Sequence, residues 1–261
     1  QAMSEPTPSR YHFSDYAAAL RQHYPTWPVD PGTALTIQAA AEGENLRGRT
    51  DRFQSPEQRH FGSTRNAWEA CRGTIATGVP SSYKGLLRLK TPFDLALYAN
   101  LVWELRPRTI LEFGSLQGGG ALWLADQLDA HAIEGGEVHS FDLMIHCVSA
   151  RARHPRLHFH HVDLFDLNTL SSELLARLPH PWLVIDDSHV NVLALLRHVD
   201  RFAEVGDYYV LEDLGLAPGF EFVDGLRQAC QLGYRIDTDY TDAFGYNVTA
   251  APNGWLRKMQ K

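Results

Sequence analysis

The stretch LEFGSLQGGGALWLA, residues 111–125, combines a short apolar run, a glycine-rich segment and a second apolar stretch. An apolar run that enters glycines and then continues with helical periodicity is typical of a strand, a tight turn and a helix. Glycines let the backbone turn sharply and approach a ligand closely. The spacing here is E-x-G-x-x-x-G-G, which differs from the G-x-G-x-x-G pattern of dinucleotide-binding proteins. The stretch therefore predicts an α/β fold with a ligand at its first strand-to-helix turn.

An acid precedes the glycines of this turn. Glu112 lies two residues before Gly114, and a carboxylate at this position suits a cationic or hydroxyl-rich ligand better than a pyrophosphate. This favours S-adenosylmethionine over NAD. The alternative is a tight structural turn that binds no ligand. The candidate cofactor-binding residues of this segment are Glu112, Gly114, Ser115, Gly118 and Gly119.

The rest of the chain from Thr91 shows a regular alternation of strand and helix patterns. Such an alternation, followed by two more strands, predicts a mostly parallel, doubly wound seven-stranded sheet. The region 3–90 lacks this rhythm and is predicted as an N-terminal cap or lid, with a short helix over 11–24, on a main domain at 91–261. The predicted helices are 92–105, 119–130, 145–152, 168–178, 190–204 and 219–232, and the predicted strands are 109–113, 137–143, 156–164, 182–186, 207–213, 234–240 and 246–252.

Acids also end the second and third predicted strands. Asp142 stands where a carboxylate commonly accepts hydrogen bonds from the ribose hydroxyls of a bound nucleoside, although it could instead cap the next helix. Asp163 is a candidate for the adenine or amino-acid end of the cofactor, with a structural role equally open. Both NAD and S-adenosylmethionine would use Asp142, so this acid supports a nucleoside without choosing between them.

Two further acid clusters follow the fourth and fifth strands, in WLVIDDSH (182–189) and YVLED (209–213). Neighbouring parallel strands deliver their carboxyl ends to one rim, where ligands bind. Three carboxylates brought together would repel one another unless a cation is present, and magnesium prefers carboxylate and water oxygens. The alternative is that the acids cap helices or face solvent. The predicted metal ligands are Asp186, Glu212 and Asp213, with the choice between Asp186 and Asp187 left open.

A histidine follows the first of these acids. His189 lies three residues after Asp186, and its ordinary pKa of about 6.5 suits a general base that takes a proton from a substrate hydroxyl. Asp186 is predicted to contact the metal, the cofactor and the reacting hydroxyl. The histidine-rich segment HPRLHFHH (154–161) is predicted to be a strand whose histidines divide between its two faces as packing or rim residues.

Composition limits the alternatives. The chain has 261 residues and a formal net charge of −7, which argues against a nucleic-acid partner. Its three cysteines contain no CxxC pair, so a zinc site or a disulfide framework built on them is not expected, and a cytoplasmic location is the simplest reading. No apolar run reaches the roughly 20 residues of a membrane span, and no signal peptide is expected.

Five segments together resemble the cephalosporin hydroxylase and rhamnosyl O-methyltransferase family: 83–95, 110–125, 184–191, 206–213 and 240–258. The resemblance implies a class I S-adenosylmethionine methyltransferase fold and magnesium held at Asp186, Glu212 and Asp213. It implies His189 as the base, a role in antibiotic biosynthesis, frequently on a deoxysugar hydroxyl, and assembly as a homo-oligomer. The chain departs from the family pattern at Gly120, where relatives often have serine, at the additional acid Asp187, and in its N-terminal third.

The resulting hypothesis is a magnesium- and S-adenosylmethionine-dependent O-methyltransferase. Its expected acceptor is a hydroxyl of a sugar, such as a rhamnosyl group, or of another small hydroxylated metabolite of a natural-product pathway. Three alternatives remain open at this point. They are an oxygenation partner of the cephalosporin hydroxylase type, an NAD-dependent oxidoreductase, and a non-catalytic nucleoside-binding protein.

Overall fold

The computed structural model describes residues 51–261 apart from 60–61, 65–66, 68–81 and 214–221. The predicted helix over 11–24 and most of the predicted cap therefore lie outside the described residues. Contacts group residues 52–261 into one compact unit. Among the helices of the described part, none has the length and apolar character that a membrane-spanning helix requires.

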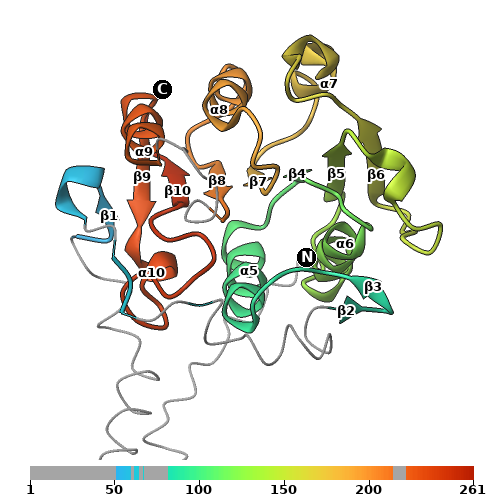
Figure 1. The fold of residues 1–261 in the computed structure, drawn as a ribbon, viewed down its shortest axis with the longest axis horizontal. Helices are drawn as coiled ribbons and strands as arrows, with labels where there is room; N and C mark the ends of the chain where they lie inside the picture. Colours follow the sequence, from blue (N-terminus) through green and yellow to red (C-terminus); the bar gives the residue numbers. More distant parts are fainter. Residues whose placement is uncertain (1–50, 60–61, 65–66, 68–81, 214–221) are drawn as a thin grey trace, which may run out of the picture. The chain divides into compact units, whose positions relative to one another are not determined.

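The strands of the described part form one large sheet and one small hairpin (Figure 1). The large sheet has eight strands in the order β1-β9-β10-β8-β7-β4-β5-β6. The hairpin consists of β2 (Ser82–Tyr83) and β3 (Leu86–Leu87). The strands of the large sheet are β1 (Phe53–Gln54), β4 (Thr109–Phe113), β5 (Glu137–Asp142), β6 (Leu157–His161), β7 (Trp182–Asp186), β8 (Tyr208–Leu211), β9 (Tyr234–Asp237) and β10 (Trp255–Lys258).

The five central strands β6, β5, β4, β7 and β8 pair in parallel, and β10, β9 and β1 are added antiparallel. The class I methyltransferase architecture predicted from the sequence is confirmed. The sheet has one strand more than the predicted seven, because β1 pairs with β9 through Phe53 and Gln54. Part of the segment that was predicted to belong to the cap thus extends the main sheet, while the division at residue 90 stays a prediction.

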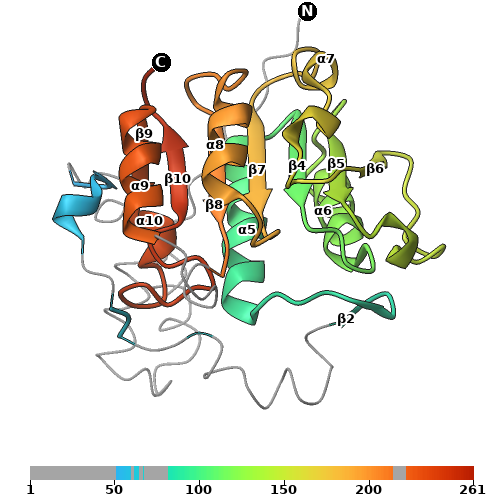
Figure 2. The same cartoon turned by 45° about the horizontal axis from the view of Figure 1, so that its top comes forward.

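Helices cover both faces of the sheet (Figure 2). Apolar residues of α8 and α9 join one core cluster with Trp182 and Val184 of β7, and residues of α5 and α6 join a second cluster with Leu183 and Ile185. Alternate residues of β7 thus point to opposite faces, as the period of a strand requires. The helices are α5 (Pro92–Leu105), α6 (Gly119–Ala130), α7 (Ser172–Leu175), α8 (Val192–Asp200), α9 (Phe222–Gln231) and α10 (Thr238–Thr241), with 3₁₀ turns η1 (Pro56–Gln58), η2 (Ile145–Cys147) and η3 (Leu167–Thr169).

The beginning of α5 is determined by its sequence. Thr91 caps the helix, since its side chain accepts a hydrogen bond from the Asp94 backbone N–H, and Pro92 takes the first helical position, where no donor is needed. The buried carboxylate of Asp94 accepts the Ala250 backbone N–H at 3.0 Å. This bond joins the first turn of α5 to the C-terminal part of the chain.

Four predicted elements were wrong in part or in full. The helix over 145–152 is reduced to the 3₁₀ turn η2, and the helix over 168–178 to η3 and the four-residue α7. The strand over 234–240 ends at Asp237, directly before α10. No strand occupies 246–252 in the described residues; the final strand is Trp255–Lys258. The polar side chains of Asn247 and Thr249 explain this difference, because they bond to other side chains of the loop instead of alternating across a sheet.

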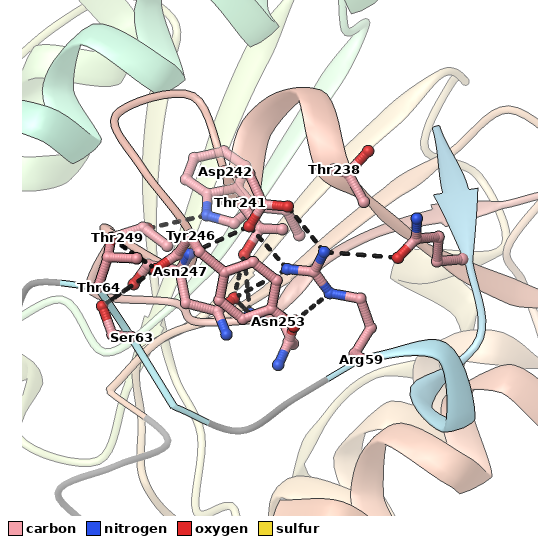
Figure 3. A network of polar contacts seen from close by, with 12 residues as sticks. Arg59, Ser63, Thr64, Thr238, Thr241, Asp242, Tyr246, Asn247, Thr249 and Asn253 are labelled. Carbon is pink, nitrogen blue, oxygen red and sulfur yellow. Dashed lines mark hydrogen bonds and ion pairs between the residues drawn. The ribbon is translucent and has the colours of Figure 1, made fainter. Parts of the chain in front are cut away.

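A buried arginine organises this C-terminal loop (Figure 3). Arg59, whose side chain is 2% exposed, makes two 2.7 Å hydrogen bonds to the carboxylate of Asp242. Its Nε donates to Asn253 Oδ1 at 2.7 Å, and its guanidinium lies 4.3 Å from the centre of the Tyr246 ring. These bonds join Asp242 and Asn253 of the C-terminal part to Arg59, which lies 183 and 194 positions earlier in the chain.

Replacing Arg59 with methionine should lower the free energy of unfolding by about 3 kcal/mol, because the buried partners lose a charged donor. Urea denaturation followed by circular dichroism measures this. Arg227→Met is the matched control, since the Arg227 side chain is 54% exposed and its ion pair with Glu57 spans 4.0 Å. Equal stability of the two variants would contradict a structural role for the Arg59 network.

Candidate active site

A cavity of about 350 Å³ opens at the carboxyl ends of the parallel strands. Its walls come from the glycine turn after β4, the residues after β5 and β6, and the loops after β7 and β8. This is the rim at which open α/β sheets bind ligands. The predicted site residues that line the cavity are Glu112, Gly114, Ser115, Asp142, Asp163, His189 and Asp213.

Two of the predicted glycines pack against protein instead. A Cβ atom at Gly118 would lie 2.8 Å from the Ala152 side chain, and one at Gly119 would lie 2.2 Å from the Leu87 carbonyl oxygen. Both glycines therefore allow close packing of the turn against its neighbours. In contrast, Gly114 and Gly120 line the cavity.

Glu112 is buried beneath this turn. Its Oε2 accepts a 2.6 Å hydrogen bond from the Ser140 hydroxyl, which also lies 2.7 Å from the Ser115 hydroxyl. Burial raises the pKa of Glu112 to about 7, even though Lys90 and Ser140 act in the opposite direction. A Cβ at Gly120 would lie 2.7 Å from Glu112 Oε1, so the departure from the family pattern at this position leaves room for the carboxylate.

Asp142 holds the glycine turn in place. Its Oδ2 accepts the backbone N–H groups of Ser115 (2.8 Å) and Leu116 (3.1 Å), and its Oδ1 accepts that of Met144 (2.7 Å). A carboxylate has about four acceptor positions, so capacity remains for a ligand hydroxyl. Asp163 also lines the cavity, and its Oδ1 accepts the Phe165 backbone N–H at 2.9 Å.

The structure joins the backbones of Asp186 and Glu212, whose N–H donates to the Asp186 carbonyl oxygen at 3.0 Å, but it directs their carboxylates to opposite faces of the sheet. Asp186 pairs with Leu211 across the parallel strands and shares the face of Tyr209, whose hydroxyl lies 3.4 Å from its Oδ2. Its Oδ1 accepts a 2.7 Å hydrogen bond from the Ser188 hydroxyl. Glu212 points to the other face, where the Tyr98 hydroxyl donates to it. Both side chains are almost fully buried, and burial raises the pKa of Asp186 to about 6.

The neighbouring acid Asp187 occupies the position predicted for Asp186. Its Oδ1 lies 3.3 Å from His189 Nε2, which in turn lies 3.6 Å from Asp213 Oδ2. One ligand atom from each of these three residues falls within 4.8 Å of the others, a spacing that could hold a metal ion. All three residues line the cavity. Asp187, His189 and Asp213 are called the rim cluster below.

Hydrogen bonds to Asp187 and Asp213 raise the pKa of His189 to about 10, although burial opposes this. Burial would also raise the pKa of Asp187, but the Lys90 ammonium and the bond to His189 lower it to about 2. At neutral pH this structure therefore contains an imidazolium between two carboxylates. The arrangement is an acidic site balanced by positive side chains.

Lys90 is the residue that sequence analysis missed. Its buried ammonium donates to Asp187 Oδ2 at 2.7 Å and also to Glu212, so that it bridges the acids that follow β7 and β8. Burial alone would lower the pKa of Lys90, but these carboxylates raise it well above its ordinary value. The available signal was a lysine immediately before the helix cap Thr91.

The choice of Asp187 could have been made from the strand period. Trp182, Val184 and Asp186 share one face, so continued alternation puts Asp187 on the other face, with Ile185. Glu212 follows Leu211 and reaches that same face. The alternation and the strand register together would have paired Asp187 with Glu212.

Comparison with known proteins gives a consistent result. The family model for rhamnosyl O-methyltransferase/CmcI matches residues 79–259. The rhamnosyl O-methyltransferase of Mycobacterium bovis (strain BCG / Pasteur 1173P2) is 26% identical over 194 residues, which cover 67% of this chain and 77% of the relative. That of Mycobacterium leprae is 26% identical over 193 residues, covering 67% of this chain and 82% of the relative.

Solved structures of CmcI are similar over a larger part of the chain. One that is described as containing Mg and SAM superimposes with a TM-score of 0.59 at 27% identity, over 84% of this chain and 95% of CmcI. Another, described with SAH, has a TM-score of 0.54 at 28% identity, over 68% of this chain and 81% of CmcI.

Proposed function

Because the chain belongs to the rhamnosyl O-methyltransferase/CmcI family and is an S-adenosylmethionine-dependent O-methyltransferase, we propose that its acceptor is a sugar hydroxyl. The acceptor belongs to a small glycosylated metabolite of a natural-product pathway. The observation that supports this most is the cavity, which Glu112, Asp142 and the rim cluster all line. The cavity therefore offers polar groups that can bind both the methyl-donating cofactor and a hydroxylated acceptor. Cytoplasmic location and homo-oligomerisation stay predictions.

The cofactor is proposed to lie across the glycine turn. Glu112 would accept a hydrogen bond from the ammonium group at the amino-acid end of the cofactor. Asp142 would accept hydrogen bonds from the ribose hydroxyls at the acceptor positions that the glycine turn does not use. Gly114 allows the close approach, since a Cβ there would lie 2.7 Å from the Asp187 carbonyl oxygen. Asp163 is assigned to the adenine end, and the match to a CmcI structure described with SAM supports this placement.

A divalent cation is proposed to bind at the rim cluster, with Asp187 and Asp213 as carboxylate ligands and His189 beside them. The donor set fits, because the carboxylates of Asp187 and Asp213 have oxygen atoms within 4.8 Å of each other in an acidic cavity. Magnesium is the cation that carboxylate oxygens favour, and a CmcI structure is described with Mg. When bound, such an ion makes an acceptor hydroxyl more acidic. Asp186 keeps a supporting role under this assignment, because its carboxylate binds Ser188.

His189 is the proposed general base. It lines the cavity with its Nε2 between Asp187 and Asp213, on the side where an acceptor hydroxyl would enter. In this structure Asp187 and Asp213 keep His189 protonated. His189 can therefore act as a base only when another cation neutralises these two carboxylates. Alignment of the hydroxyl with the methyl group would supply much of the remaining rate enhancement.

The alternative functions have less support. The cavity carries Glu112 near the turn, where a pyrophosphate would be repelled, which disfavours an NAD-dependent oxidoreductase. A non-catalytic nucleoside-binding protein would not need the rim cluster. An oxygenation partner would need an iron site in the cavity, and the rim cluster that lines the cavity offers one histidine, His189, where a two-histidine, one-carboxylate triad needs two.

The test is transfer of labelled methyl groups from S-adenosylmethionine to a panel of rhamnosyl and other deoxysugar glycosides, with magnesium present or removed by EDTA. We expect label in at least one glycoside, and none when its sugar hydroxyls are already methylated. The sugar assignment fails if only non-sugar hydroxyls, such as catechols, accept the methyl group. The metal assignment fails if EDTA leaves the rate unchanged.

Cofactor affinity should depend on pH through Glu112. With a pKa of about 7, the carboxylate is protonated below this pH and ionised above it. Its ionised fraction rises about tenfold between pH 6 and pH 8, and the apparent affinity for S-adenosylhomocysteine should rise by about the same factor. Isothermal titration calorimetry measures this. The variant Glu112→Gln should bind more weakly and without this pH dependence; an equally steep rise in that variant would contradict the role of Glu112.

A further inference from the structure

Away from the cavity, three metal-ligating side chains meet at the amino ends of two neighbouring strands. Glu137 and His139 are separated by two positions on β5 and so point to the same face, and His158 of the edge strand β6 is the direct register partner of His139. One ligand atom from each of the three lies within 4.8 Å of the others. The function proposed above uses none of these residues.

The spacing of the ligand atoms is that of a bound metal ion. The Glu137 carboxylate oxygen lies 3.5 Å from His139 Nε2 and 3.6 Å from His158 Nε2. Two ligand atoms at the usual zinc distances of about 2.0–2.1 Å, in tetrahedral geometry, are about 3.4 Å apart. Two of the three separations thus match tetrahedral zinc, and the third, between the two histidine nitrogens, is at most 4.8 Å.

The histidine nitrogens lack other partners. Nε2 of His139 and Nε2 of His158 are buried, and neither has a hydrogen-bond partner among the described residues. His139 as a whole is only 5% exposed, so its nitrogen has no free access to solvent. Buried polar atoms without partners are uncommon in native proteins and often indicate an ion or water that would satisfy them.

A fourth histidine orients the site from behind. His160 Nε2 lies 3.0 Å from His139 Nδ1, and their rings stack with centroids 5.2 Å apart. When His139 Nδ1 donates this hydrogen bond, its Nε2 carries a lone pair that faces Glu137. Metal-binding histidines commonly use their second nitrogen in this way.

We propose that Glu137, His139 and His158 form a second metal site, specific for a divalent transition metal and fitted best by Zn²⁺. Two imidazoles and one carboxylate suit zinc, whereas the oxygen-rich rim cluster suits magnesium. The site joins the edge strand β6 to β5. The sequence predicted His158 to be a packing or rim residue, because the convergence of Glu137, His139 and His158 from two strands is visible only in three dimensions.

The test is titration of the full chain with Zn²⁺ in isothermal titration calorimetry, in a background that carries Asp187→Asn and Asp213→Asn to weaken the rim cluster. The background protein should bind one zinc ion, and His158→Ala should lower the affinity at least 100-fold. His158 is partly exposed, so this variant should fold, which circular dichroism verifies. His161→Ala is the matched control, because His161 is exposed on the opposite face of the same strand, and its zinc affinity should stay within about twofold.

A second measurement separates specific binding from general surface binding. The melting temperature should rise on addition of zinc in the background protein and in the His161 variant, and stay unchanged in the His158 variant. His160→Ala should weaken zinc binding about tenfold through loss of its hydrogen bond. The proposal is overturned if the background protein binds no zinc at 100-fold molar excess, or if His158→Ala binds it as tightly as the control. These results do not depend on methyl transfer.

Discussion

Asp187→Asn should reduce the rate of methyl transfer by about 10³-fold, while Asp186→Asn should retain activity within about tenfold. Asp187 lines the cavity and contacts both His189 and Lys90. Removing its charge eliminates one of the two proposed metal carboxylates and frees His189 from one partner. Losses of 10²–10⁴-fold, on the order of this value, are usual when a group that acts on a reacting proton or charge is removed.

Asp186 is the matched control in this comparison. Its carboxylate is buried on the other face of the sheet and accepts a hydrogen bond from Ser188, which the side-chain oxygen of asparagine can also accept. Single-turnover rates with saturating S-adenosylmethionine, together with cofactor affinity, distinguish chemistry from binding. If Asp186→Asn is inactive and Asp187→Asn is active, then Asp186 is the metal ligand and the assignment made from the geometry is wrong.

Lys90→Met should lower the free energy of unfolding by about 4 kcal/mol, because it leaves Glu212 and Asp187 buried without their shared cation. For a compact unit of this size, that corresponds to a melting temperature lower by about 10 °C. Added magnesium should recover part of this loss, since a divalent ion can replace the missing positive charge. Differential scanning calorimetry with and without magnesium measures both effects.

Lys84→Met is the control for this substitution. The Lys84 side chain is 56% exposed and pairs with Asp126 at the surface, so its loss should cost no more than about 1 kcal/mol and should not respond to magnesium. If Lys90→Met is as stable as this control, the ammonium is not needed to balance the buried acids. If it is unstable but insensitive to magnesium, the ion does not bind next to Asp187.

The order of strands and helices could be predicted from the sequence because it depends on local patterns. Apolar runs of four or five residues, such as the one from Trp182 to Ile185, form strands, and the cap at Thr91 begins a helix. The last strand was misplaced because Asn247 and Thr249 follow an extended-looking pattern, yet they bond to Thr241 of α10 and Trp255 of β10. No local pattern reveals partners of this kind.

The sequence by itself determined that acids end four parallel strands and therefore lie at one rim of the sheet, since the carboxyl ends of such strands always meet there. Only the tertiary structure decided which acids face each other. Asp186 and Asp187 are chemically equal neighbours, but successive residues of a strand point to opposite faces of the sheet. Lys90 therefore reaches Asp187, while Asp186 bonds to Ser188 on the other face. The convergence of Glu137, His139 and His158 likewise depends on the register of β5 and β6, which is set by the packing of whole strands and not by either segment alone.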